Sequence, residues 1–261
     1  MKCLNFYLFV FYCLTTLSVF AQAPRRIVED DLAKSFKRID YWDQRHNKDT
    51  SWSDSLQAAN DVFGKKLQYY TNNYPETMSS LYNLEALGLK ITESSDGLFR
   101  IYSWDEKGGG TMHEFENVMQ YRDKDRTHSI WARDTDMGRL DKYIPFYTKI
   151  YTLKVKNKIY YLGIYAGIYC SACRGQGLQV FSIENGKLND DVKIIKTHTG
   201  LHSQLYYEYN LYYALHKNAR SLLHFDASSK TIFVPVVEKE KITNYYLLYR
   251  FNGQYFERVK N

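Results

Sequence analysis

The residues best suited to acid–base chemistry stand together in the segment His113-Glu114-Phe115-Glu116. If this segment is a β-strand, Glu114 and Glu116 lie on the same face, because side chains alternate along a strand. Two carboxyl groups at a set separation can hydrolyse a glycosidic bond. Glu114, Glu116 and His113 are therefore the candidate catalytic residues, and the alternative interpretation is a solvated face of a sheet.

A second set of reactive residues is the pair Cys170 and Cys173, which has the spacing C-x-x-C. Redox enzymes with this spacing usually place the first thiolate at a helix N-terminus, which stabilises it. Here a turn sequence, Arg174-Gly175-Gln176-Gly177, and a further strand follow instead. The spacing therefore favours a disulfide that tightens the loop between two strands, with redox catalysis as an alternative.

The same cysteines also belong to the pattern C-x2-C…H-x3-H, which His198 and His202 complete. Thiolate and imidazole ligands suit tetrahedral zinc, although the long gap is about twice the usual one and the histidines fall in a loop. The sequence therefore predicts no metal and no cofactor, and Cys170, Cys173, His198 and His202 stay the alternative zinc ligands.

Aspartates around Trp131 form a further candidate cluster, which could offer oxygen ligands to calcium: Asp123, Asp125, Asp134, Asp136 and Asp141. The EF-hand spacing is not met, because Gly138 and Pro145 stand where oxygen ligands are required. A solvated loop is the interpretation that the sequence favours, with a looser calcium site as the alternative.

The cellular compartment decides between several of these alternatives, and residues 1–21 predict a signal peptide. Lys2 precedes an almost unbroken apolar run from Leu4 to Phe20, and Ala21 ends a cleavage site before Gln22. The run is short and diluted for a membrane span, so we expect a mature chain without a transmembrane helix. We therefore expect an exported protein of the periplasm, the cell envelope or the extracellular space. Export favours oxidation of the remaining cysteines and argues against nucleic acid as a partner.

Composition indicates a β-rich protein with a dispersed positive charge. The 261 residues carry a net charge of +6 without a long block of like charges, as expected of a solvated surface. Tyrosine, with 25 residues, suits a half-buried pleated sheet. Adjacent tyrosines could stack on sugars, but packing between strands is favoured for Tyr160-Tyr161, Tyr206-Tyr207, Tyr212-Tyr213 and Tyr245-Tyr246.

The segment 22–90 has the apolar spacing of amphipathic helices. Residues at three- and four-residue steps predict two helices, the first with Val28, Leu32, Phe36, Ile39 and Trp42 and the second with Trp52, Leu56, Ala59, Phe63, Leu67 and Tyr70. A third, shorter helix is predicted to begin at Pro75, to carry Leu81, Leu84 and Leu87, and to end at Gly88.

The segment 91–261 consists of short apolar runs separated by turn sequences. Asn185-Gly186 and Asn252-Gly253 predict hairpins with type I′ turns, and closely spaced turns predict antiparallel pairing. The predicted fold class is therefore α+β, with two or three N-terminal helices followed by a large antiparallel β-meander. We expect a curved sheet or open barrel, with a small propeller-like arrangement as the alternative, and one unit formed with residues 22–90.

Four stretches of the chain resemble an uncharacterised exported protein family of Bacteroidota. They are 94–105 with 109–113, and the segments around the two Asn-Gly turns, 184–190 and 249–256. The resemblance covers nearly all of the mature chain and implies envelope localisation and one integrated unit. It implies no known activity and assigns no role to any residue.

Two hypotheses for function follow. The first is a non-catalytic envelope or periplasmic protein that binds an envelope protein or a glycan through an aromatic sheet face or its loops. The alternative is an exported hydrolase that acts on glycans or peptidoglycan through carboxylates of residues 113–116 and 123–141. The chain has no nucleophile elbow, phosphate loop or zincin motif, which favours the first hypothesis.

Overall fold

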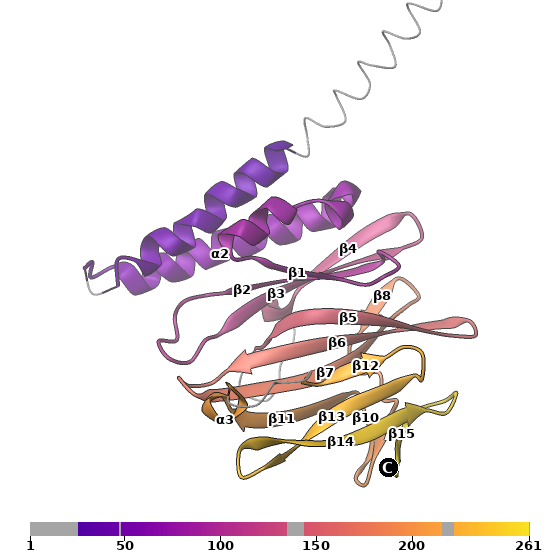
Figure 1. Ribbon diagram of the computed structural model, residues 1–261. Helices are drawn as coiled ribbons and strands as arrows, with labels where there is room; N and C mark the ends of the chain where they lie inside the picture. The colour runs from indigo at the N-terminus through magenta and orange to yellow at the C-terminus, as the bar shows by residue number, and fades with distance from the viewer. Residues whose placement is uncertain (1–25, 47, 135–143, 216–221, 261) are drawn as a thin grey trace, which may run out of the picture.

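The computed structural model describes residues 26–46, 48–134, 144–215 and 222–260. A layer of helices covers one side of three successive β-sheets (Figure 1). Three buried hydrophobic clusters lie between these layers: one joins the helices to the first sheet, one joins the first and second sheets, and one joins the second and third sheets. The predicted α+β class is confirmed.

The helical layer contains a helix over residues 26–43 and α2 (Trp52–Asn73). The predicted apolar face of the first helix is confirmed, because Val28, Leu32, Phe36 and Ile39 are buried. Polar contacts also join the two helices, since Lys66 Nζ lies 2.6 Å from Asp31 Oδ1 and the Tyr70 hydroxyl donates to Asp31 Oδ2 at 2.9 Å.

The predicted third α-helix is replaced by two short 3₁₀ helices, η1 (Pro75–Ser79) and η2 (Tyr82–Leu87). Between them Ser80 is extended and Leu81 takes a left-handed conformation with φ 71°. Arg100 donates to the carbonyl oxygens of Thr77 and Ser80, so these acceptors are not used by a continuous helix. The predicted end at Gly88 is confirmed, with φ 104°.

The first sheet has the strand order β1-β2-β3-β4 and is antiparallel throughout. Its strands are β1 (Lys90–Glu93), β2 (Phe99–Asp105), β3 (Phe115–Asp123) and β4 (Arg126–Trp131), followed by the 3₁₀ turn η3 (Ala132–Asp134). Both faces of β2 and β3 are buried, one under the helices and one under the second sheet.

The second sheet has the order β11-β7-β6-β5, with β8 paired to β7. Its strands are β5 (Phe146–Val155), β6 (Lys158–Ile168), β7 (Cys173–Glu184), β8 (Lys187–Asn189) and β11 (Gln204–Asn210), which leads into the short helix α3 (Leu211–Leu215). The third sheet has the order β10-β9-β15-β14-β13-β12 and contains the parallel pair β15–β9. Its strands are β9 (Ile195–Thr197), β10 (Gly200–His202), β12 (His224–Asp226), β13 (Thr231–Glu238), β14 (Lys241–Phe251) and β15 (Phe256–Val259).

The strands therefore form three open sheets, whereas the sequence predicts one curved sheet or open barrel. The part of the chain that the structure describes contains neither a barrel nor a propeller. The physical reason is burial on both faces, because strands such as β2 and β7 carry long apolar runs that need a cover on each side. Stacking the sheets provides these two covers.

The two Asn-Gly hairpins are confirmed, but their turns differ. Asn185 and Gly186 both have positive φ, at 52° and 76°, as a type I′ turn requires. At the second turn the paired residues are Phe251 and Phe256, so the connection is longer than two residues. The Asn252 side chain accepts hydrogen bonds from the backbone of Gln254 and Tyr255 there.

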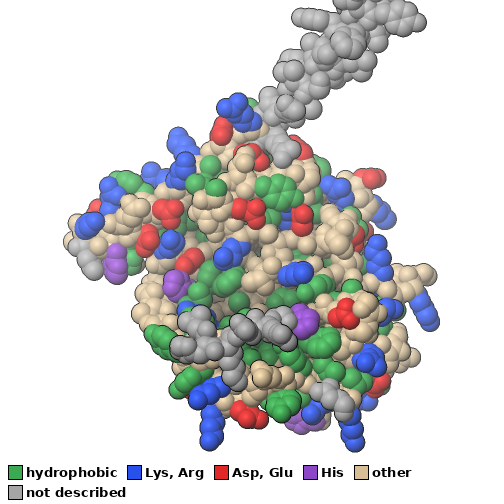
Figure 2. Space-filling model, viewed as in Figure 1, with side chains coloured by type: hydrophobic (Ala, Val, Ile, Leu, Met, Phe, Trp, Pro, Cys, Tyr) green, Lys and Arg blue, Asp and Glu red, His purple; other side chains and the backbone are tan. Residues whose placement is uncertain are grey.

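Two further sequence expectations concern the surface. On the face shown in Figure 2, Lys and Arg side chains are interspersed with Asp and Glu, as the dispersed charges of the sequence predict. Within the described ranges, none of the helices combines the length and the apolar composition needed to cross a bilayer.

Helix α2 approaches the first sheet so closely that a side chain at Gly64 would overlap the indole ring of Trp131. We expect Gly64→Ala to lower the free energy of unfolding by about 1–3 kcal/mol, because overpacking forces the helix or the ring to shift. Urea unfolding of the purified protein measures this change. Val62→Ala, at an exposed position of the same helix, is the matched control. Equal stability of Gly64→Ala and wild type would contradict the packing.

Candidate functional site

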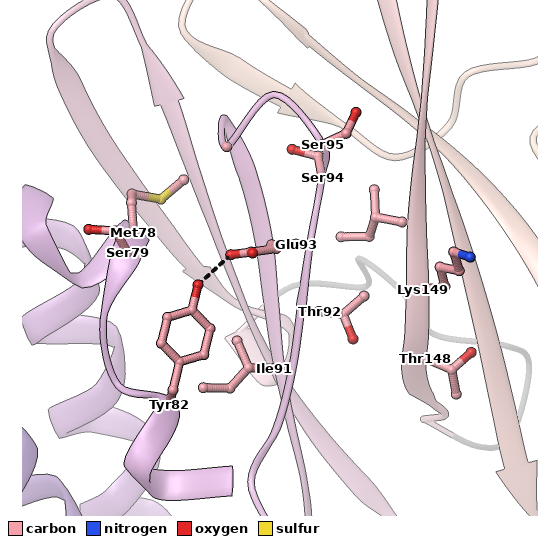
Figure 3. A pocket seen from close by; sticks show the side chains of 12 residues that line it. Met78, Ser79, Tyr82, Ile91, Thr92, Glu93, Ser94, Ser95, Thr148 and Lys149 are labelled. Carbon is pink, nitrogen blue, oxygen red and sulfur yellow. Dashed lines mark hydrogen bonds between the residues drawn. The ribbon is translucent and has the colours of Figure 1, made fainter. Parts of the chain in front are cut away.

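A groove opens where the η1–η2 segment meets β1 and β5 (Figure 3). Its volume is about 580 Å³, and Tyr82 points across it from η2 toward Glu93 on β1. The exposed polar residues of its lining are Ser79, Tyr82, Glu93, Ser95, Thr148 and Lys149. Residues with phenol, carboxylate, hydroxyl and ammonium groups thus line one groove, which makes it a candidate small-molecule site.

Tyr82 and Glu93 are held by the guanidinium group of Arg100. The Tyr82 hydroxyl donates to Glu93 Oε2 at 3.0 Å, and Arg100 Nη2 lies 3.1 Å from the same oxygen. The guanidinium carbon lies 4.6 Å from the centre of the Tyr82 ring, within reach of a cation–π contact. One charged group therefore fixes both the ring and the carboxylate of the groove.

Arg100 is fully buried, with 0% of its surface exposed. A buried charge is strongly destabilising unless it is paired and hydrogen-bonded. Here Nη1 donates to the carbonyl oxygens of Thr77 and Ser80 at 2.7 and 2.8 Å, and Glu93 supplies the negative charge. Arg100 therefore connects the η1 segment, β1 and β2 beneath the groove.

The backbone before Tyr82 is strained. Leu81 has φ 71°, a region that a bulky residue rarely occupies. Its N–H donates to Glu29 Oε1 at 2.8 Å, which ties this turn to the first helix. Backbone strain such as that at Leu81 is concentrated at functional sites.

Burial raises the pKa of Tyr82, so its hydroxyl stays a neutral donor at physiological pH.

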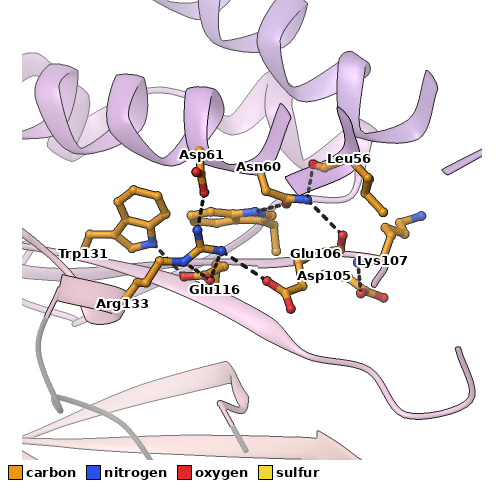
Figure 4. A network of polar contacts seen from close by, with 10 residues as sticks. Leu56, Asn60, Asp61, Asp105, Glu106, Lys107, Glu116, Trp131 and Arg133 are labelled. Atoms are coloured by element: carbon orange, nitrogen blue, oxygen red, sulfur yellow. Dashed lines mark hydrogen bonds and ion pairs between the residues drawn. The ribbon is translucent and has the colours of Figure 1, made fainter. Parts of the chain in front are cut away.

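Of the sequence-predicted catalytic residues, Glu116 lies in a network between α2 and the first sheet (Figure 4). Arg133 Nε donates to Glu116 Oε1 at 2.6 Å, and Trp131 Nε1 donates to Glu116 Oε2 at 2.7 Å. Arg133 also pairs with Asp61 and Glu106. Burial raises the pKa of Glu116, whereas its contacts with Arg133 and Trp131 oppose that rise.

Glu106 is the most perturbed acid of this network. Its pKa is raised to about 8, first by burial, then by a hydrogen bond with Glu114 and by the charge of Glu116. One guanidinium group faces several carboxyl groups here, so Glu106 keeps its proton near neutral pH. The network brings Glu114 and Glu116 together with Glu106, Asp61 and Arg133, which the sequence does not single out because they lie far apart along the chain.

His113, the third predicted catalytic residue, belongs to a different cavity. Its Nδ1 lies 2.5 Å from Asp105 Oδ2, and both residues line a cavity of about 290 Å³ together with Phe115 and Phe146. His113 thus does not take part in the hydrogen bonds of Glu116 with Arg133 and Trp131. The candidate catalytic set of the sequence is divided between two places.

The Cys170–Cys173 disulfide of the sequence analysis is confirmed. Both thiols are used by this bond, and within the described residues no group of three or more His, Cys, Asp or Glu side chains is arranged to hold a metal ion. His202 Nε2 lies 2.8 Å from Thr199 Oγ1, and His198 lines a separate cavity with Tyr249 and Arg258.

Of the aspartates near Trp131 that could bind calcium, Asp136 and Asp141 lie outside the described residues.

The predicted tyrosine pairs differ in their surroundings. Tyr160 and Tyr161 are buried between sheets, as packing predicts. Tyr212, Tyr213 and Tyr245 are instead exposed. The tyrosine of the groove, Tyr82, stands alone in the sequence and belongs to none of these pairs.

No sequence motif marks the residues that line the groove. One signal is available, because Arg100 interrupts the apolar run 98–104 and a charge inside a buried strand needs a partner. Comparisons of the chain with protein-family models, curated proteins and solved structures find no match. The groove and its residues are therefore the basis on which a function can be inferred.

Glu106 gives the fold a pH dependence. The pKa is about 8 in the folded protein and 4.5 for the ordinary side chain, so the folded state holds a proton that the unfolded chain releases. The contribution of Glu106 to the free energy of unfolding is therefore expected to fall as the pH rises from about 4.5 to about 8 and then to level off. We expect Glu106→Gln to flatten this fall and to stabilise the protein at pH 8 by roughly 1–3 kcal/mol.

Urea unfolding at a series of pH values measures this effect. Asp125→Asn, at an exposed turn residue, is the control and should keep the wild-type slope. Identical pH profiles of wild type and Glu106→Gln would contradict the assignment of the proton to Glu106.

Proposed function

We propose that the protein is an exported, non-catalytic saccharide-binding protein, and that the groove beside Tyr82 is its binding site. The observation that carries this proposal is the fixed position of the Tyr82 ring. Arg100 covers one face of the ring, and 43% of the Tyr82 surface is still exposed. The exposed part can pack against the C–H face of a sugar ring without loss of side-chain freedom, because the tyrosine is already ordered.

The other groups of the groove suit the hydroxyl groups of a sugar. Glu93 accepts hydrogen bonds, Lys149 donates them, and Ser95 can do both. The Thr148 hydroxyl donates to the Ile164 carbonyl at 3.2 Å, which leaves it as an acceptor. The two charges are opposite in sign, so the lining does not select for a strongly charged ligand. A combination of one aromatic face with several polar groups gives orientation and specificity in a concave site.

An extended peptide is a poorer occupant of the groove. Peptides often add as a strand to an exposed sheet edge, and β1 and β5 each have such an edge. However, Thr92 Oγ1 donates to the Tyr147 carbonyl at 3.1 Å and joins the two edges directly. A peptide strand therefore has no continuous path between β1 and β5.

Hydrolysis is the alternative function, and the lining of the groove argues against it. Glycosidases need two carboxyl groups at a set separation across the scissile bond. Among the described residues that line the groove, Glu93 is the only carboxylate. Glu116 is occupied by Arg133 and Trp131, and Glu106 is hydrogen-bonded with Glu114.

Export and an envelope location are part of the same proposal. They rest on the leader-like residues 1–21 and on the resemblance to exported proteins of Bacteroidota, and a cell-envelope saccharide would be the ligand encountered there. We expect the protein recovered from the envelope or the medium of expressing cells to begin at Gln22, as N-terminal sequencing or intact mass would measure. Recovery of the chain with Met1 in the cytosol would contradict export.

The binding proposal predicts that Tyr82→Ala lowers saccharide affinity about tenfold or more, because the ring supplies most of the contact area. Binding is measured on an array of envelope-type oligosaccharides and then by calorimetry with the best ligand. Tyr82→Phe keeps the ring and should lose less affinity than Tyr82→Ala.

The matched control is Tyr245→Ala, which removes a 72% exposed tyrosine from β14. It should bind as wild type does. Loss of affinity in Tyr245→Ala but not in Tyr82→Ala would place the site elsewhere. Turnover of an oligosaccharide by the purified protein would overturn the non-catalytic assignment.

A further inference from the structure

The disulfide between Cys170 and Cys173 lies in the turn that joins β6 to β7. Cys173 is exposed and Cys170 is partly exposed. The backbone N–H groups of Ala172 and Cys173 both donate to Cys170 Sγ, at 3.3 and 2.9 Å. Hydrogen bonds of this kind stabilise a thiolate more than a neutral sulfur. The N–H groups of this turn thus take the place of a helix N-terminus after the cysteines.

A positive charge reinforces this environment. Arg174 Nη1 donates to the carbonyl oxygens of Cys170 and Cys173, at 2.7 and 3.0 Å, which holds the guanidinium group against the turn. The acid that faces this region from β11 is Glu208, and it accepts a hydrogen bond from the Tyr206 hydroxyl. A neighbouring cation lowers the pKa of a thiol and makes its thiolate a better leaving group.

The disulfide contributes little to holding the turn. The hairpin ladder of β6 and β7 runs up to the pair Ile168 and Arg174, and Tyr169 N–H donates to the Cys173 carbonyl at 3.0 Å. In addition, the stabilisation by a disulfide decreases with the length of the loop that it closes, and this loop is very short. A purely structural role therefore explains the bond poorly.

Exposed aromatic side chains lie on the two elements next to the turn, β11 and α3. The Leu211 N–H donates to the Ala172 carbonyl at 2.8 Å, which fixes the start of α3 beside the disulfide. Tyr212 and Tyr213 follow on α3 and are exposed, and Tyr206 is exposed on β11. An exposed aromatic surface next to a reactive bond is suited to docking of another protein.

We propose that Cys170–Cys173 is an exchange-active disulfide that oxidises a dithiol of a partner protein. This activity is independent of the saccharide groove. A partner thiolate attacks Cys173 Sγ, the sulfur–sulfur bond breaks, and Cys170 Sγ leaves with the electron pair as a thiolate. The second partner thiolate then attacks the partner sulfur of the mixed disulfide, and Cys173 leaves. The partner becomes a disulfide, and this protein gains two electrons and holds the reduced cysteine pair.

The purified protein tests this proposal with glutathione as the probe. It is equilibrated with mixtures of reduced and oxidised glutathione, quenched with acid, alkylated and weighed by mass spectrometry. We expect full reduction at about 10 mM reduced glutathione, whereas structural disulfides resist the glutathione pool. A bond that stays oxidised under these conditions, after equilibrium has been verified from both directions, would overturn the proposal.

Two variants sharpen the test. Arg174→Gln should shift the equilibrium three- to tenfold toward the disulfide, because the thiolate loses its cationic neighbour. Arg250→Gln, at an exposed arginine of β14, is the matched control and should leave the equilibrium unchanged. Equal shifts in both variants would contradict the role of Arg174.

Trapping and turnover address the activity itself. Cys170→Ser should accumulate a mixed disulfide of Cys173 with glutathione, and wild type should accelerate oxidation of a reduced, unfolded model protein by glutathione disulfide. The double variant Cys170→Ser/Cys173→Ser should not accelerate it, and its melting temperature should stay within a few degrees of wild type. A wild-type rate equal to that of the double variant would overturn the proposal.

Discussion

The ion pair between Arg100 and Glu93 is the interaction on which the described site depends. Arg100 has no exposed surface, and its charge is tolerated in the interior because Glu93 pairs with Nη2 and two backbone carbonyl groups accept hydrogen bonds from Nη1. These acceptors belong to β1 and to the segment after α2. The same contacts lie at the end of η1 and place the Tyr82 ring against the guanidinium group. The contacts of Arg100 thus account both for the backbone conformation near Ser80 and for the position of Tyr82 in the groove.

Seven of the described tyrosines are buried in the interior. Stacked sheets need large side chains that fill the space between two layers, and Tyr102, Tyr147, Tyr161 and Tyr165 do so without appreciable exposure. Their hydroxyl groups find acceptors, such as Gln120 for Tyr102 and Gln179 for Tyr147, at 2.8 and 2.7 Å. A buried tyrosine is stable only with such a partner. Tyr82 differs from these buried rings, because it is partly exposed and lies against the guanidinium group of Arg100.

Local patterns in the sequence predict the elements well and their assembly less well. The apolar spacing of residues 28–42 predicts the first helix, and Asn185-Gly186 predicts a hairpin with the turn observed. Both features depend on neighbours in the chain. The break at Leu81 and the division into three sheets depend on contacts between distant residues, such as Arg100 with Thr77. For the same reason the sequence suggests Glu114 and Glu116 but not Glu106 and Arg133, which complete their network in space.

Nuclear magnetic resonance would test the central claim most directly, by mapping where a saccharide binds. The labelled protein is titrated with an oligosaccharide of the cell envelope, and changes in chemical shift are followed for tyrosine rings and backbone amides. The account predicts that the largest changes fall on Tyr82, Glu93, Ser95 and Lys149, which line the groove. Changes centred on Tyr212, Tyr213 or Tyr245, with Tyr82 unaffected, would contradict it.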